Sequence, residues 1–354
     1  MTIEVSWFGA LCDDDYEFLG VSDPALKSSW PHCRDIVQTA DRLGFDNILL
    51  PSGYSLGIDT VSFASAIAPT VDQIQLLVAV RMGEMWVPQL ARQLATIDQM
   101  LDGRLTINII SSDIPGESLE SAPRYQRTIE WMQALRTLLN NEKLEIHGEF
   151  LELDLEPPRI STVSGTCPPM YFGGFSEAAK DVAAREADVF LTWPDTVASV
   201  GATAAEMQDR AAEHGRNLAI GLRSHVIVRE TEEEARAAAD RLISKLDAET
   251  GAAIRGKSLD AASVGVQRQA ALRDSASDDG YAEPNLWTGI GKARSGAGAA
   301  IVGNPDQVTE KIEAYQDAGV SAFIFSGYTH IAEAARFAEL VLPRLDHGRL
   351  RASL

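Results

Sequence analysis

The chain of 354 residues is 45% hydrophobic and 23% charged, and it carries a formal net charge of −20 at pH 7. These values fit a globular enzyme with a full core, and the negative charge argues against nucleic-acid binding, which needs a basic surface. The sequence has no apolar run of 18 residues and no N-terminal leader, so we expect no membrane span and a cytoplasmic location. The scattered cysteines predict neither a disulfide framework nor a metal site; they are Cys12, Cys33 and Cys167.

Short apolar runs alternate with amphipathic stretches along the whole chain. Strands are predicted over residues 3–8, 47–50, 75–81, 105–110, 170–172, 189–192, 218–228, 299–302 and 322–325. Helices are predicted over residues 31–43, 88–101, 124–139, 176–185, 204–214 and 306–318. This alternation, repeated about eight times, indicates an α/β protein whose parallel sheet closes as a TIM (β/α)8 barrel. A doubly wound open sheet is the competing fold, but residues 9–15 lack the Gly-rich phosphate turn that normally follows its first strand.

One long segment interrupts the alternation. No repeat and no low-complexity linker divides the chain, so residues 1–354 are predicted to form a single domain. The segment from about 245 to 292 stands before the last strands and is too long for an ordinary loop. We interpret it as a lid, because Arg294 follows it directly. The alternative is an insertion that packs on the flank of the barrel without a function.

Two polar residues stand within the strand predicted over 218–228. Arg223 and His225 are two positions apart, so their side chains share one face of that strand. An arginine beside an imidazole suits the binding of an anion and the movement of a proton next to it. In isolation, two solvated side chains at a strand edge would explain the pair better. A matching set near the last strand favours a functional site; it consists of Arg294, Tyr328 and His330.

Six short motifs spread over the chain point to a known family. They read YFGG at 171–174, LTW at 191–193, HVIVRE at 225–230, PNLWTGIG at 284–291, RSGAG at 294–298 and SGYTH at 326–330. Together they resemble the bacterial luciferase-like flavin monooxygenases, in particular the alkanesulfonate monooxygenase branch, from Trp7 to about Leu345. The resemblance implies a TIM barrel with a long insertion, reduced FMN (FMNH2) and O2 as cosubstrates, and cleavage of a sulfonate to sulfite and an aldehyde. It also implies a homodimer or homotetramer. Because no nicotinamide motif is present, a separate NAD(P)H-dependent flavin reductase would supply the reduced FMN.

The flavin phosphate is assigned to the turn Gly173-Gly174-Phe175-Ser176, which follows a predicted strand. Two glycines let the backbone approach an anion, and Ser176 can both cap the next helix and contact the phosphate. By analogy with the family, Tyr125 adds a phenol hydroxyl there, and Asn108 and Ser111 line the other end of the flavin. The alternative is a strand-to-helix turn that binds no ligand.

A sulfonate is an anion with several acceptor oxygens, and in a partly dry pocket it needs charge-assisted donors. Arg223 and Arg294 are the candidate donors. The indole N–H of Trp193 is a third, although a buried tryptophan can equally be ordinary core.

The oxidation belongs to the flavin, and the protein has to supply a base or a proton relay beside the substrate carbon. By this reasoning the relay comes from one of three residues, which are His225, Tyr328 and His330. The choice among them is open, and His330 could instead serve only to begin a helix.

Two turns depart from the family pattern. The turn after the second strand has Tyr54 where the alkanesulfonate enzymes have an arginine, and residues 11–16 lack the histidine that those enzymes carry after the first strand. A phenol and the carboxylates of residues 13–15 are good partners for hydroxyl groups. We therefore assign Tyr54 to substrate binding and expect a polyhydroxylated sulfonate such as sulfoquinovose as the substrate. The alternative is that the acidic run faces solvent.

Two rival functions stay open. One is a luciferase-like oxidoreductase that uses flavin or a deazaflavin on a substrate without a sulfonate. The other is a flavin-binding protein without catalytic activity, against which the combination of arginines, histidine and tyrosine speaks. A barrel aldolase is less favoured, because no lysine stands at a strand end as a Schiff-base candidate.

Overall fold

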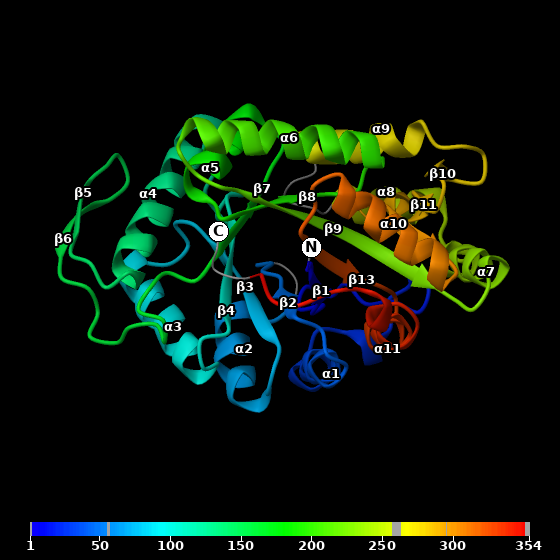
Figure 1. Ribbon diagram of the computed structural model, residues 1–354, viewed down its shortest axis with the longest axis horizontal. Coiled ribbons are helices and arrows are strands. Elements are labelled where there is room, and N and C mark those ends of the chain that lie inside the picture. Colours follow the sequence, from blue (N-terminus) through cyan, green and yellow to red (C-terminus); the bar gives the residue numbers. More distant parts are fainter. Residues whose placement is uncertain (1, 55–56, 257–262, 295, 351–354) are drawn as a thin grey trace.

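Parallel strands close into a barrel at the centre of the protein (Figure 1). The computed structural model describes residues 2–54, 57–256, 263–294 and 296–350. In spatial order the wall consists of β1 (Glu4–Phe8), β2 (Asn47–Leu50), β3 (Gln75–Arg81), β4 (Leu105–Ile110), β7 (Met170–Gly173), β8 (Val189–Thr192), β9 (Ala219–Val228) and β13 (Ala322–Ser326). The ring closes because β9 pairs with both β8 and β13, and β13 pairs with β1. The predicted TIM barrel is therefore confirmed.

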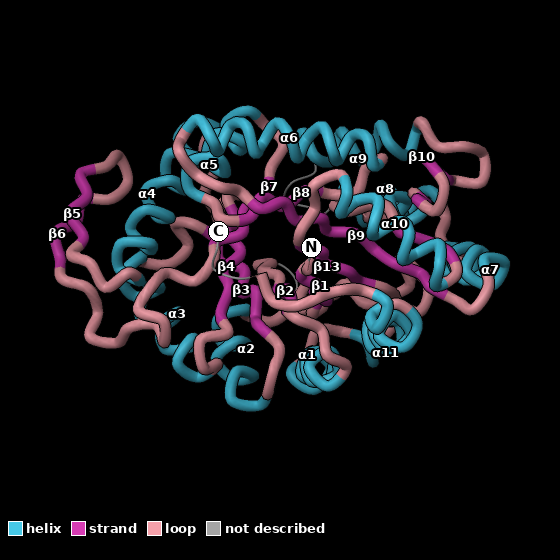
Figure 2. The backbone as a smooth tube through the Cα atoms, in the orientation of Figure 1, coloured by secondary structure: helices cyan, strands magenta, loops and turns pink. Residues whose placement is uncertain are grey.

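Burial on both faces explains why the barrel strands are continuous apolar runs. Every residue of β1, β2, β3 and β13 is buried. A ring of helices surrounds the barrel (Figure 2). Side chains on the inner face of each strand pack inside the barrel and those on the outer face pack under the helices, so most positions on both faces are apolar. The ring consists of α1 (Trp30–Arg42), α2 (Thr60–Ile67), α3 (Val87–Met100), α4 (Ser121–Leu139), α5 (Glu177–Glu186), α6 (Val197–Glu213), α10 (Pro305–Asp317) and α11 (His330–Leu340).

Capping side chains define where many of these helices begin. Ser29 caps α1, Thr196 caps α6, and Asn304 forms a capping box with Gln307 at α10. The sequence pattern does not predict α2, whose eight residues are too few for a clear helical period. Four short 3-10 helices complete the helical elements of the described residues: η1 (Pro24–Leu26), η2 (Ala68–Thr70), η3 (Gly289–Lys292) and η4 (Leu342–Arg344).

β9 is longer than the barrel wall and carries a small additional sheet. The first part of β9 pairs with β8, and the last part pairs with β12 (Ala300–Gly303). Antiparallel strands β11 (Leu286–Trp287) and β10 (Tyr281–Glu283) continue from β12. The strand predicted over 299–302 therefore exists, but it belongs to this extension and not to the barrel wall.

Two segments interrupt the regular alternation of strands and helices. The segment predicted as an insertion, residues 245–292, contains α8 (Ala248–Gly256), α9 (Val264–Asp274), β10, β11 and η3, and it follows α7 (Glu232–Ile243). The hairpin of β5 (Leu144–His147) and β6 (Glu152–Leu155) projects beside α4 (Figure 1). Within the described residues, no helix is long and apolar enough to cross a membrane.

The interior of the barrel contains a carboxylic acid, Glu4. Its side chain is completely buried and accepts hydrogen bonds from the hydroxyls of Tyr171 (2.9 Å) and Ser6 (3.1 Å). Burial raises the pKa of Glu4 from 4.5 to about 7, although these hydrogen bonds lower it. A carboxyl group whose pKa is raised by folding contributes stability that is complete below pH 4.5 and is lost as the pH rises through about 7.

We expect the Glu4→Gln variant to become more stable relative to wild type as the pH rises. Glutamine cannot ionise, so it avoids a cost of about 3 kcal/mol that corresponds to the rise in the pKa. Chemical denaturation at about pH 5 and about pH 8.5 would measure the difference in the free energy of unfolding between variant and wild type. A difference that does not change with pH would contradict the prediction.

The Glu130→Gln variant is the matched control, because its stability relative to wild type should change with pH in the opposite direction. Burial by itself would raise the pKa of Glu130, but hydrogen bonds from Gln126 and from the backbone N–H groups of residues 149–151 lower it. A carboxyl group whose pKa is lowered stabilises the fold above its unfolded pKa. The Glu130→Gln variant should therefore be less stable than wild type at neutral pH and approach it as the pH falls.

Candidate active site

A cavity of about 450 Å³ opens at the carboxyl ends of the barrel strands. Cavities of this size take small organic ligands, and this end of a TIM barrel carries the catalytic site. The predicted site residues that line it are Asn108, Ser111, Tyr125, Gly174, Phe175, Ser176, Trp193 and Arg223. The predicted residues that do not line it are Tyr54, His225, Arg294, Tyr328 and His330.

The turn after β7 has the form of an anion cradle. The chain is tightly packed at Gly174, where a Cβ atom would lie 2.6 Å from the Cβ atom of Ala179. The Ser176 hydroxyl caps α5 by accepting a hydrogen bond from the N–H of Ala179 at 3.2 Å, and it donates one to the Tyr125 hydroxyl at 3.2 Å. The free N–H groups in the first turn of a helix attract an anion. The structure thus brings Gly174, Ser176 and Tyr125 together at one helix N-terminus.

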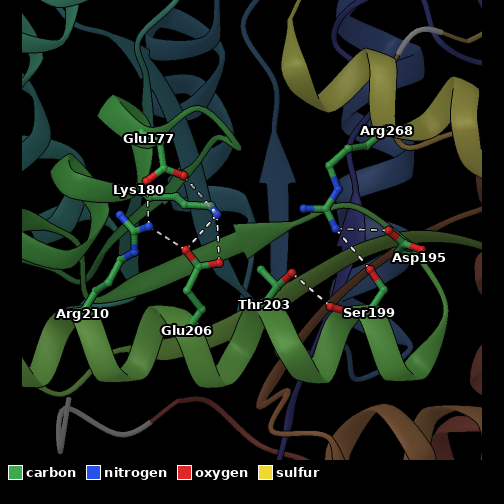
Figure 3. Close-up of polar contacts among 8 residues, drawn as sticks. All are labelled: Glu177, Lys180, Asp195, Ser199, Thr203, Glu206, Arg210 and Arg268. Atoms are coloured by element: carbon green, nitrogen blue, oxygen red, sulfur yellow. Dashed lines mark hydrogen bonds and ion pairs between the residues drawn. The ribbon is translucent and has the colours of Figure 1, made fainter.

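Ion pairs between charged side chains connect α5 to α6 (Figure 3). The ammonium of Lys180 pairs with Glu206 at 2.8 Å, and Arg210 pairs with both Glu177 and Glu206 at 2.7 Å. Glu177 lies in the first turn of α5, where its charge would repel an anion. Arg210 compensates that charge, so the network holds the cradle in place and removes the repulsion.

The rest of the wall combines apolar surface with an unpaired donor. Its apolar side chains include Leu49, Ile109, Leu191 and Ile324. Arg124 lies beside Tyr125 and pairs with Asp113 at 3.1 Å, but its Nε is buried and has no partner among the described residues. A flavin ring needs apolar walls and its phosphate needs donors. This lining therefore fits the FMN that the sequence resemblance implies.

The helix α9, from the long insertion, forms one side of the cavity. Residues 263–265 line it. Gly265 lies directly against two rings, because a Cβ atom there would be 2.7 Å from the indole of Trp193 and 3.1 Å from the ring of Phe175. The Arg268 guanidinium lies 4.4 Å from the ring centroid of Phe175. It also donates hydrogen bonds of 3.2 Å to two side chains at the start of α6, Asp195 and Ser199 (Figure 3).

Arg223 brings a buried positive charge to the cavity. The residue is 6% exposed, and its Nη1 donates to the carbonyl of Ser224 and to Oγ of Ser326, both at 2.9 Å. The guanidinium lies 4.4 Å from the ring centroid of Phe8. Its Nη2 has no partner, and no carboxylate in the described part of the chain pairs with it. Burial lowers the pKa of Arg223 to about 10, which still leaves it charged at neutral pH. A buried cation without a counter-ion favours an anionic ligand.

The other predicted arginine already has a counter-ion. Arg294 forms an ion pair with Asp14, and its Nη1 donates to the hydroxyl of Tyr328 at 3.0 Å. That hydroxyl donates in turn to Oδ1 of Asp14 at 2.7 Å. Burial raises the pKa of Tyr328 to about 12, so its phenol is neutral. Arg294 therefore offers less free charge to an anion than Arg223 does.

Both predicted histidines are buried and neutral. Burial, helped by the charge of Arg223, lowers the pKa of His225 well below its usual value, and burial lowers the pKa of His330 to about 4. The ring of Tyr328 lies 5.1 Å from that of His225 and 5.7 Å from that of His330. His330 also stacks on Phe8 at 5.6 Å. The predicted catalytic residues thus form one connected cluster beside Phe8, and Arg223 links it to the cavity.

The acidic run after β1 points inward. Asp14 binds Arg294, as described above. Asp15 is 4% exposed, pairs with His32 at 3.0 Å and accepts a hydrogen bond from the backbone N–H of His330 at 3.1 Å. The alternative that this run faces solvent is therefore wrong for Asp14 and Asp15.

The structure does not bring Tyr54 to the cavity. It lies in the turn after β2, and its side chain is 71% exposed. The structure adds residues that the sequence did not assign to the site, namely Phe8, Arg124, Gly265 and Ser326. Phe8 and Ser326 are the last residues of barrel strands, and this position in the sequence could have identified them as site residues.

The fold and the cavity agree with the comparisons to known proteins. The model of the luciferase-like monooxygenase family matches residues 18–322, and the chain belongs to this family. The predicted resemblance is thereby confirmed.

Two relatives within this family are similar to the chain over almost its whole length. The chain is 60% identical to a sulfoquinovose monooxygenase of Novosphingobium aromaticivorans, with 98% of each chain covered. It is 50% identical to a sulfoquinovose monooxygenase of Agrobacterium fabrum, with 97% of this chain and 89% of that one covered. Among solved structures, it is similar in fold to a riboflavin lyase determined with a modified FMN and riboflavin. That likeness has a TM-score of 0.79 at 14% identity and covers 97% of this chain and 91% of the other.

Proposed function

We propose that this protein is a two-component, FMNH2-dependent monooxygenase that cleaves the carbon–sulfur bond of an organosulfonate, with sulfoquinovose as the preferred substrate. The observation that carries the proposal is Arg223, a buried guanidinium without a counter-ion among the described residues, on the wall of a cavity that also contains an anion cradle. Two anion sites in one cavity suit two ligands, one with a phosphate and one with a sulfonate. The relatives named sulfoquinovose monooxygenase support this choice of substrate.

The cradle would hold the phosphate of FMN through Ser176, Tyr125 and the first turn of α5. Asn108 and Ser111 would lie along the ring, together with the aromatic side chain of Phe175. When bound, reduced FMN supplies two electrons to O2, of which one atom becomes the aldehyde oxygen and the other leaves as water, while sulfite is released. A separate NAD(P)H-dependent flavin reductase would supply the reduced form.

The chain's own residues would bind and enclose the substrate. Nη2 of Arg223 and the indole of Trp193 would donate to sulfonate oxygens. The polar cluster of Asp14, Arg294 and Tyr328, which Arg223 connects to the cavity wall, would bind the hydroxyl groups of a sugar, which a linear alkyl chain lacks. The helix α9 would act as the cover that keeps water from the reacting atoms.

A sulfite-release assay tests this function. Reduced FMN, regenerated by an added flavin reductase, would be offered with sulfoquinovose or with a linear alkanesulfonate at equal concentration. We expect faster sulfite release from sulfoquinovose. Faster release from the linear compound would overturn the substrate assignment. Release from neither, with turnover of another substrate by reduced FMN or a reduced deazaflavin, would instead favour the rival oxidoreductase.

The cradle can be tested by replacing Ser176 with alanine. The variant loses one hydroxyl, but the backbone donors remain, so we expect FMN affinity to fall only about 3- to 10-fold. Loss of the helix cap should also reduce stability by about 1 kcal/mol. Thr231→Ala is the control, because Thr231 caps α7 in the same way but does not line the cavity. Fluorescence titration with FMN would measure both variants, and an unchanged affinity in Ser176→Ala would argue against the phosphate site.

A further inference from the structure

Two consecutive hydrogen bonds connect Arg223 to His225 through Ser326. Ser326 ends β13 and lies directly opposite His225 of β9 in the parallel register. Nη1 of Arg223 and Oγ of Ser326 are 2.9 Å apart, and Oγ of Ser326 and Nδ1 of His225 are 2.8 Å apart. Ser326 is completely buried and His225 is 1% exposed, so neither bond is open to bulk solvent.

The direction of the second bond follows from the first. A guanidinium has donors only, so the Ser326 oxygen must accept from Arg223. The single hydroxyl proton of Ser326 is then free to be donated, and Nδ1 of His225 is the acceptor within reach. Because the buried imidazole is neutral, it carries one proton. With Nδ1 accepting, that proton is on Nε2.

His330 has the same tautomer for a different reason. Its Nε2 lies 2.9 Å from the carbonyl oxygen of Asp14, which can only accept, so Nε2 carries the proton. Nδ1 of His330 has no hydrogen bond among the described residues, and Nε2 of His225 has no well-aligned one, although the backbone carbonyl of Ala297 lies close enough to the His225 imidazole to favour a proton on it. The two imidazoles therefore present opposite groups, since His225 offers a donor N–H and His330 offers an acceptor lone pair.

We propose that Ser326 is a positioning residue that holds His225 as the Nε2–H tautomer and couples it to the arginine that binds the anion. In this arrangement His225 donates a hydrogen bond and is not the base. Among the two histidines, only His330 presents a nitrogen that can accept a proton. The effect of Ser326 on turnover rests on the proposed function, but the tautomer is a property of the protein alone.

Nuclear magnetic resonance of the 15N-histidine-labelled protein tests the tautomer directly. Ring nitrogens with and without a proton have well-separated 15N shifts, and the His225 signals would be assigned by their loss in a His225→Asn variant. We expect a bare Nδ1 and a protonated Nε2 in the wild-type protein. A protonated Nδ1 would overturn the inference without any measurement of activity.

Ser326→Ala tests the role of the hydroxyl. We expect His225 to lose its single Nε2–H tautomer, the KM for sulfoquinovose to rise about 5- to 10-fold, and kcat to fall about 10-fold. Ser326→Thr keeps a hydroxyl and should restore the tautomer. An unchanged tautomer and an unchanged KM in Ser326→Ala would overturn the inference.

Ser224→Ala is the matched control. Ser224 is also completely buried and adjoins His225, but the single proton of its hydroxyl is within reach of the carbonyls of His225 (3.1 Å) and Ala299 (3.4 Å), and no hydrogen bond joins this hydroxyl to an imidazole nitrogen among the described residues. Its loss should leave the His225 tautomer unchanged, and a shift equal to that of Ser326→Ala would contradict a specific role of Ser326. If the wild-type protein shows the expected tautomer but releases no sulfite from any sulfonate, the proposed function fails while the assignment of the tautomer is supported.

Discussion

Replacing Arg223 with methionine should lower the kcat/KM for sulfite release about a thousandfold. Leaving a buried anion without its charge partner costs about 3–5 kcal/mol of free energy. Each 1.36 kcal/mol corresponds to a factor of ten in the rate. Methionine retains an unbranched apolar chain that can still cover the ring of Phe8. Steady-state sulfite release would measure the loss, and calorimetric titration with the sulfonate would show whether it lies in binding. Sulfite release close to wild type would remove Arg223 from the anion site.

The same variant should keep its fold and its flavin site. Arg223 has no counter-ion in the described residues and is only 6% exposed, so methionine removes a desolvated charge from the core. FMN affinity should change little, because the cradle at Ser176 is a separate site. Arg104→Met is the control: Arg104 is 9% exposed, precedes β4 at the other end of the barrel, and donates to three backbone carbonyls. Its loss should reduce stability but leave the kcat/KM of the folded protein unchanged.

Replacing Gly265 with leucine should weaken both FMN and sulfonate binding by about 10- to 100-fold. The first carbon of the new side chain would meet Trp193 at 2.7 Å and Phe175 at 3.1 Å, and both rings line the cavity. Overpacking of this kind costs about 1–3 kcal/mol, either by moving α9 away or by displacing the two rings. The helix itself should persist, because leucine has a higher helix propensity than glycine.

Flavin fluorescence titration and the KM for the sulfonate would measure the effect of this variant. Gln267→Leu is the matched control, since it places the same side chain on the exposed face of the same helix. That control should bind both ligands normally. Unchanged affinities in Gly265→Leu would mean that α9 does not rest on Trp193 and Phe175 when the ligands are bound.

Much of the fold was predictable, and the errors have physical causes. All eight barrel strands lie within one or two residues of the predicted ranges, because strands that are buried on both faces appear as continuous apolar runs. The strand at β12 was found by the same signal, but no local pattern distinguishes a wall strand from one that pairs with the end of β9. The β5–β6 hairpin was missed because its side chains are largely exposed and polar.

The site was predictable where residues lie within or just after barrel strands. Asn108 and Arg223 lie within β4 and β9, whereas Gly174, Ser176 and Trp193 follow β7 or β8, and all of them line the cavity. The position of a residue along a strand could not decide which of the two arginines, Arg223 or Arg294, lacks a counter-ion among the described residues. Tyr328 and Asp14 are 314 positions apart, and their contact next to Arg294 depends on closure of the barrel between β13 and β1. Tyr54 also lies after a barrel strand, but it is 71% exposed and does not line the cavity.

The sequence by itself determined the barrel, the family and the set of residues available for chemistry, because burial patterns and short motifs are local properties of the chain. Only the tertiary structure decided how charges and protons are distributed among those residues. In the part of the chain that the structure describes, Arg223 lacks a counter-ion while Arg294 has Asp14, and Ser326 directs the proton of His225. These differences depend on which distant strand ends lie within about 3 Å of one another, since hydrogen bonds and ion pairs act only at that range.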